Sequence, residues 1–203
     1  MSILSDADKQ RIEAAVAAAE QKTAAEFVVV RVAASDAYAG VRWFAAGLFA
    51  LTISAALALA FPVLRAGEVL GLQLLLALLA FWITGRPALL RGLTPEALKR
   101  EAVERAARLA FLEHTLFATR ERTGVLILVS EQEHHVAILG DEGIHQRVQE
   151  LGWQQHVDTI VKAIHAGKAA DGVCEVIAAL SEVLAHGVSV RADDVNELPN
   201  RVR

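Results

Sequence analysis

The sequence predicts an α/β fold in which a small mixed β-sheet is covered by helices and is interrupted by a two-helix transmembrane hairpin. Two short runs, 26–32 and 125–130, are rich in β-branched residues and apolar on nearly both faces, as expected of strands covered on two sides. Several longer segments place apolar residues at helical spacing. Between the two strands, charge nearly vanishes over residues 41–83, a composition typical of membrane-spanning segments.

This pattern divides the chain into four expected regions. Residues 1–40 supply the first part of the domain, with a helix, a strand and a linker, and residues 41–85 form the hairpin. Residues 86–187 form the remainder of the domain, and residues 188–203 form an extended C-terminal tail. Because two spans return the chain to the side it left, the parts before and after the hairpin share a compartment and form one domain.

The hairpin contains one long and one short apolar segment. Residues 43–64 would make a helix of about 33 Å, which matches a hydrocarbon core of about 30 Å. Residues 69–83 are too few for that thickness, so this segment borrows flanking residues, thins the bilayer or stops short as a re-entrant segment. We expect it to span, because a lone first span would leave the second apolar run in water.

Positive charge sets the expected orientation. On the domain side of the hairpin lie six basic residues, Arg31, Arg42, Arg86, Arg91, Lys99 and Arg100, whereas the opposite turn has only Arg65, balanced by Glu68. Both termini are therefore predicted to be cytoplasmic. Trp43 and Trp82 lie at the domain-proximal ends of the two segments, where indole rings favour the membrane interface.

Composition excludes some classes of partner and compartment. The formal net charge is −4, and the sequence lacks a block of basic residues, so no nucleic-acid partner is expected. Cys174 is the one cysteine and cannot form an internal disulfide. Residues 1–11 carry charges and no apolar core, so no signal peptide is expected there.

The first elements have clear local signals. Ser5 and Asp8 have the spacing of a capping box, which predicts a helix to about Thr23. After the hairpin, residues 86–92 are expected to lie along the membrane surface. Thr94 and Pro95 then predict the N-cap and first position of a helix that runs to about residue 122, with Gly124 as its C-cap. Its apolar stripe is predicted at Leu98, Ala102, Leu109, Leu112 and Leu116.

The remaining elements complete the sheet and cover it. A third strand at 136–139 follows the second after a short connection, which favours antiparallel pairing, whereas the helical crossover favours parallel pairing of the first two. Two helices then follow, separated by a break at 167–172. Their apolar faces are Trp153, Val157, Ile160, Val161 and Ile164, and Val173, Ile177, Leu180 and Leu184.

The densest group of titratable residues, between 130 and 145, is a candidate site for a divalent cation. Its acids and histidines occupy loops at opposite ends of one strand, more than about 10 Å apart, so one site does not use them all. Asp141 and Glu142 remain as candidate metal ligands, with His145 as an optional third. In the alternative interpretation these acids belong to a turn and cap the next helix.

No complete catalytic constellation is visible, so the sequence leaves open whether the protein is an enzyme. Cys174 lacks a phosphate-loop context and is interpreted as a small core residue. Ser130 is followed by an acid and not by glycines that would bind an anion. The polar tail residues Asp193, Asp194, Asn196, Glu197 and Asn200 are interpreted as an interaction tail, with cation binding or a solvated end as alternatives.

The order of elements resembles the TPM domain family, bacterial membrane form with a transmembrane hairpin inserted in the domain. The resemblance rests on four motifs and on the tail at 193–200. The motifs are KTAAE at 22–26, TGV at 123–125, GDEGI at 140–144 and the GKAADG break at 167–172. It implies the bacterial inner membrane and an association with LemA-like membrane proteins. The family is also described as a phosphatase group.

These observations together predict a membrane-anchored cytoplasmic interaction or assembly module that self-associates. Small residues in the first span, Ala46, Gly47, Ser54, Ala55 and Ala58, would allow close helix packing, and Gln73 in the second span needs a hydrogen-bond partner. Packing of the two spans against each other is the alternative. The alternative function, implied by the resemblance, is a metal-assisted phosphatase that uses Asp141 and Glu142.

Overall fold

The structure is a computed structural model and describes residues 3–63, 65–147, 152–189 and 202. The chain divides into two compact units. Met1–Ser35 and Arg100–Arg203 form the sheet unit, and Asp36–Lys99 form the hairpin unit.

The sheet unit contains a three-stranded mixed sheet in the order β1-β2-β3. Strand β1 (Glu26–Val32) pairs in parallel with β2 (Gly124–Ser130), and β2 pairs antiparallel with β3 (His135–Gly140). The predicted fold class and both predicted pairings are confirmed. The pairing of Glu26 with Gly124 and of Ser130 with His135 fixes the register at the two ends of β2.

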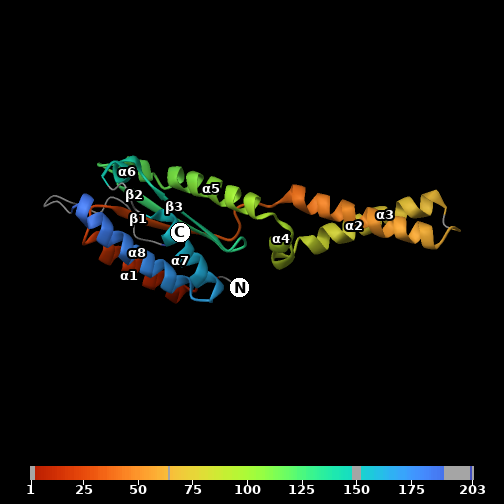
Figure 1. The fold of residues 1–203 in the computed structure, drawn as a ribbon, viewed down its shortest axis with the longest axis horizontal. Coiled ribbons are helices and arrows are strands. Elements are labelled where there is room, and N and C mark those ends of the chain that lie inside the picture. Colours follow the sequence, from red (N-terminus) through yellow and green to blue (C-terminus); the bar gives the residue numbers. More distant parts are fainter. Residues whose placement is uncertain (1–2, 64, 148–151, 190–201, 203) are drawn as a thin grey trace. The chain divides into compact units, whose positions relative to one another are not determined.

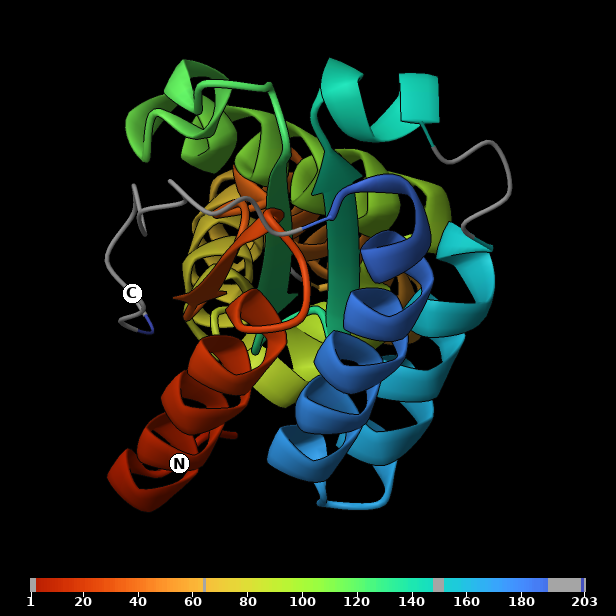
Figure 2. The same ribbon diagram turned by 90° about the vertical axis from the view of Figure 1, so that its left-hand side faces the viewer.

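Alternation along these strands sends side chains to two covered faces. Phe27, Val125 and Ile127 contribute to one core, which α1 (Asp6–Glu20), α7 (Trp153–His165) and α8 (Ala169–Gly187) cover. Val28 and Leu126 contribute to the other core, which α5 (Glu96–Glu113) and the 3₁₀ turn Leu116–Ala118 cover. Figures 1 and 2 show the sheet between these two helical layers. The short helix α6 (Glu142–Arg147) follows β3.

The predicted apolar faces of α7 and α8 are confirmed, and so is the burial of Ala102 and Leu116, but the other three residues of the stripe expected after the hairpin are wrong. Leu98, Leu109 and Leu112 are exposed, whereas the buried side chains of α5 are Ala102, Val103, Ala107 and Ala110. The exposed leucines lie on a different side of α5 from the buried residues that pack against the sheet. Small residues line the true contact because they let the helix axis approach the sheet closely.

The predicted end of α5 is also wrong. The helix stops at Glu113, and Thr115 adopts a left-handed backbone with φ of 53° before the 3₁₀ turn begins. Leu116 thereby enters the core, fully buried, directly against Gly124. A Cβ atom on Gly124 would lie 2.8 Å from the Leu116 carbonyl oxygen, so this glycine starts β2 and permits the close contact, instead of capping α5.

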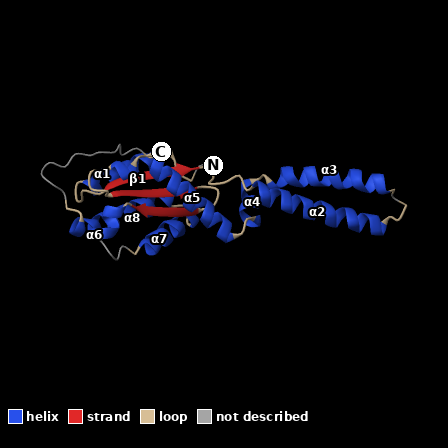
Figure 3. Cartoon of the chain, turned by 90° about the horizontal axis from the view of Figure 1, so that it is seen from above, coloured by secondary structure: helices blue, strands red, loops and turns tan. Residues whose placement is uncertain are grey.

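The hairpin unit consists of α2 (Ala39–Ala60), α3 (Ala66–Thr84) and the short α4 (Pro87–Leu93). Helices α2 and α3 run side by side in Figure 3. Both are long and apolar enough to cross a membrane. The second helix borrows flanking residues, so its 19 residues reach about 28 Å. Glu68 accepts a hydrogen bond from the Arg65 N–H at 2.8 Å and so caps its start.

Small side chains pack inside the hairpin and large apolar side chains point outward. Ala46, Ala50 and Ser54 follow an i, i+4, i+8 stripe and are almost fully buried, as are Ala80 and Thr84 of α3. The outward residues are large and exposed: Phe44, Leu48, Phe49, Leu51, Leu59, Leu70, Leu74, Leu75, Leu78 and Leu79. Part of the small-residue stripe therefore serves intrachain packing.

Candidate functional site

Asp141 lies at the junction between β3 and α6, at the end of the sheet that was predicted to hold a cation. Its carboxylate is buried, and Oδ1 accepts a hydrogen bond from the Glu142 N–H at 2.7 Å. Its own N–H donates to the Gly124 carbonyl at 2.9 Å. Asp141 thus caps α6 and extends the pairing of β2 with β3, which was the alternative interpretation of this turn.

Both oxygens of the Asp141 carboxylate also accept hydrogen bonds from Arg122. Arg122 Nε lies 2.7 Å from Oδ2, and Nη2 lies 2.9 Å from Oδ1. This bidentate arrangement is the strong form of an ion pair. The hydrogen bond to Asp141 raises the pKa of Arg122 above its ordinary value. We call this pair the Arg122–Asp141 clasp.

Backbone contacts hold the clasp from both sides. Arg122 itself has a φ of 58°, a conformation that is rare outside glycine. The Gly143 N–H donates to the Arg122 carbonyl at 2.9 Å. A Cβ atom on Gly143 would lie 2.2 Å from the Glu121 carbonyl oxygen and 2.6 Å from that of Arg122, so only glycine fits there. The loop before β2 and the loop after β3 therefore form one fixed structure.

Glu142 does not join Asp141 in a common site. Its side chain is exposed, and Oε1 accepts a hydrogen bond from Gln146 Nε2 at 3.0 Å along α6. His145 lies on the same helix with its ring centroid 6.1 Å from that of Trp153. Among the residues that the structure describes, no three His, Cys, Asp or Glu side chains form a group that could hold a metal ion.

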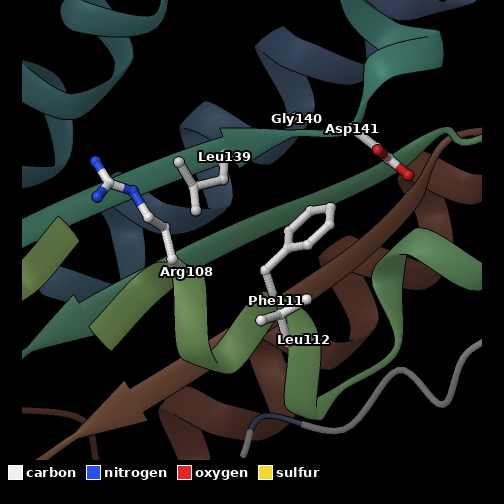
Figure 4. Close-up of a pocket in the computed structure, with 6 residues that line it drawn as sticks. All are labelled: Arg108, Phe111, Leu112, Leu139, Gly140 and Asp141. Atoms are coloured by element: carbon white, nitrogen blue, oxygen red, sulfur yellow. The ribbon is translucent and has the colours of Figure 1, made fainter. Parts of the chain in front are cut away.

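A shallow pocket of about 300 Å³ lies beside Asp141, between α5 and the end of β3. Arg108, Phe111 and Leu112 line it from α5, and Leu139, Gly140 and Asp141 line it from β3 and its end. Figure 4 shows the Arg108 guanidinium and the Asp141 carboxylate at opposite ends of the pocket, pointing away from each other. Arg108 donates to Glu104 at 3.1 Å. The pocket is thus mainly apolar, without convergent polar groups.

A buried polar network that was not predicted from the sequence connects the carboxyl ends of β1 and β2. Glu133 is 2% exposed and accepts hydrogen bonds from the Ser130 hydroxyl and from the Ser35 N–H, the latter at 3.1 Å. The Ser35 and Ser130 hydroxyls lie 2.8 Å apart. The spacing of Ser130 and Glu133 repeats that of the Ser5 capping box, and this was the signal available in the sequence.

This network has a structural role. The Glu131 N–H donates to the Val32 carbonyl, and the Gln132 N–H donates to the Ala33 carbonyl, each at 3.0 Å. Together with the Ser35 bonds, they hold the segment after β1 against the turn between β2 and β3. Ser130 is fully buried, so its hydroxyl is not accessible to a substrate.

The predicted interface tryptophans lie at the same end of the hairpin. Trp43 stacks on Phe81 with 4.1 Å between ring centroids, and Trp82 is 68% exposed. Arg42 and Arg86 lie over the rings of Phe81 and Trp82. The assignment of these tryptophans to a membrane interface stays a prediction.

Of the remaining residues singled out in the sequence, the structure describes Cys174 but not those of the C-terminal tail. Cys174 is half-buried on α8 next to the core, and burial raises the pKa of its thiol. The tail residues Asp193, Asp194, Asn196, Glu197 and Asn200 lie outside the described residues. Val202 is described: it packs against the core, and its N–H donates to Glu13 Oε1 at 3.1 Å.

Comparisons with known proteins identify a domain type and a shared fold. The family model for the TPM domain matches residues 90–183. No curated protein matches the sequence significantly. Among solved structures, the NMR structure of the BA42 protein from the psychrophilic bacterium Bizionia argentinensis matches with a TM-score of 0.61 and 18% sequence identity. The alignment covers 99% of this chain and 94% of BA42, and at that identity it supports similarity of fold alone.

Proposed function

Because this chain carries a TPM domain together with two helices long and apolar enough to cross a membrane, we propose that it is a membrane-anchored cytoplasmic interaction or assembly module of the bacterial inner membrane. The observation that supports this most is the outward face of the hairpin unit. Phe44, Leu59, Leu70 and Leu74 are each 64–83% exposed, whereas the alanines between the helices are buried. In water this arrangement would leave a large apolar surface uncovered, and lipid covers it.

The sheet unit then presents its surfaces at the bilayer. Leu109 and Leu112 of α5 are 60% and 59% exposed, and Leu112 lines the apolar pocket. An apolar surface with few convergent polar groups suits protein contact better than catalysis. By the resemblance, the partner is a second copy or a LemA-like membrane protein.

Self-association through the hairpin is part of this proposal. Ala55 and Gly47 are exposed on α2, outside the stripe that packs against α3. Gln73 is half-buried on α3, and the structure gives its amide no hydrogen bond within the described chain. In lipid an unpartnered amide favours contact with another helix, and small residues permit a close approach.

Mass measurement of the protein purified in mild detergent tests the proposal. We expect an oligomer, or a complex with a second membrane protein. The double variant Ala55→Leu with Gln73→Leu should weaken an oligomer held by the hairpin, whereas Ala56→Leu with Gln73 intact is the matched control on the neighbouring exposed position. A wild-type particle that is monomeric and without a partner would contradict the proposal.

The metal-assisted phosphatase has less support from the site. Arg122 occupies both oxygens of Asp141, and the Glu142 side chain points elsewhere. A cation at Asp141 would have to displace that guanidinium. We expect phosphomonoester hydrolysis to be unaffected by Mg²⁺, Mn²⁺ or Ca²⁺ after chelation. Hydrolysis that returns when a metal is added back, and that is lost in Asp141→Asn, would support the phosphatase hypothesis instead.

A further inference from the structure

We propose that the end of the hairpin formed by Arg42 and Arg86 is a binding site for the phosphate of an anionic phospholipid. This inference rests on the proposed membrane anchoring and adds a specific lipid class to it. The site is defined by these two arginines and by the aromatic rings of Phe81 and Trp82 beneath them.

Both guanidinium groups are held on one turn of α3. The Arg42 guanidinium carbon lies 4.1 Å from the Phe81 ring centroid, and that of Arg86 lies 5.7 Å from the Trp82 ring centroid. Arg42 Nη2 also lies beside Gly85, the residue that precedes Arg86, so both cations lie at the same end of α3. Stacking occupies the flat face of a guanidinium and leaves its edge donors available for phosphate oxygens.

Arg42 is also held by the end of α3. Its Nη2 donates to the Phe81 carbonyl at 3.1 Å, in the last turn, where the helix dipole is negative. A Cβ atom on Gly85 would lie 2.8 Å from that nitrogen, so the absence of a side chain at Gly85 leaves room for it. Arg42 Nε is buried and has no hydrogen-bond partner among the described residues. The donor groups of this arginine therefore exceed the acceptors around it.

No acid of the hairpin unit neutralises these two charges. Glu96 pairs with Lys99 at 2.7 Å, Glu68 caps the opposite end of α3, and Asp36 accepts a hydrogen bond from the Tyr38 N–H. In the described part of the chain, neither Arg42 nor Arg86 has a carboxylate partner. Two stacked arginines without acids, flanked by exposed Trp43 and Trp82 at a membrane interface, match the phosphate of an acidic lipid.

The test compares lipids retained by the full chain. The protein is reconstituted in bilayers of equal phosphatidylcholine and phosphatidylglycerol, extracted in mild detergent and weighed with its bound lipids by native mass spectrometry. We expect enrichment of phosphatidylglycerol. Arg42→Gln and Arg86→Gln should each reduce that enrichment by about fivefold, and the double variant should remove nearly all of it.

Arg65→Gln is the matched control, because it removes one positive charge from the opposite end of the same hairpin. It should leave the enrichment unchanged. Equal retention of both lipids by the wild type, or an equal loss in Arg65→Gln, would overturn the lipid site. Resistance of the protein to alkaline extraction from membranes is measured in parallel, so that failure of anchoring is distinguished from failure of lipid selection.

Discussion

At the scale of single residues, the Arg122–Asp141 clasp connects two loops that are 19 positions apart in sequence. Asp141 is buried with a 5% exposed side chain, so loss of its partner leaves a charge away from water. We expect Arg122→Gln to lower the free energy of unfolding measurably, and by more than the loss of an arginine from an exposed surface pair does. Urea titration followed by tryptophan fluorescence measures this, because Trp153 packs against Gly140 beside the clasp.

Arg108→Gln serves as the control for the clasp on the same pocket. Arg108 pairs with Glu104 four residues away on the helix surface, where both side chains are more than half exposed. Such pairs contribute about 0.5 kcal/mol or less. Equal destabilisation by the two substitutions would show that Asp141 does not depend on Arg122.

Cys174 provides a prediction on pH. Burial is the main cause that raises the pKa of its thiol, and only the thiolate reacts with alkylating reagents. At pH 7.5 the folded chain should therefore react more slowly than the same chain in urea, and its rate should continue to rise at pH values where an ordinary thiol has levelled off. A reaction rate unaffected by unfolding would contradict this.

At the scale of elements, α7 and α8 meet through Gly172. A Cβ atom there would lie 2.4 Å from the Ala163 Cβ and 3.3 Å from the Ile160 Cα. Gly172→Ala should therefore destabilise the protein by about 1–3 kcal/mol in thermal or urea unfolding, because the helices must move apart. Ala163→Gly in the same chain should recover part of the loss.

Gly92→Ala on α4 is the contrasting control for Gly172→Ala. No atom lies within 4 Å of its added Cβ, so the substitution should be neutral or slightly stabilising. If both alanines had the same effect, close packing would not be the reason that glycine is needed at position 172.

Some elements were predictable from sequence because one local signal dominates them. β1 has the predicted bounds, and the Ser5 capping box starts α1 as expected. The exposure of Leu109 was not predictable, because it depends on which face of α5 packs against the sheet, and the smaller alanines allow a closer contact there. The Arg122–Asp141 clasp was not predictable, because it depends on a left-handed residue at 122 and on the approach of two loops.

At the scale of the whole molecule, the proposed membrane anchoring predicts which side of the membrane each part faces. Two spans would bring the chain back, so that residues before and after the hairpin share a compartment. Positive charge favours the cytoplasm for that side, since Arg42, Arg86 and Arg91 outnumber the single Arg65 at the opposite turn. We therefore expect reporter fusions at either terminus to show a cytoplasmic location.

Cysteine labelling tests the same topology at the turn. In a Cys174→Ser background, Gly67→Cys should react with a membrane-impermeant maleimide added outside spheroplasts, because Gly67 is exposed and no other described segment lies within 4 Å of its added Cβ. Gly92→Cys has equally open surroundings on the other side of the hairpin and should react only after the membrane is permeabilised. If Gly67→Cys reacted from the inside alone, the hairpin would not span, since a crossing by α2 already places this turn on the opposite side.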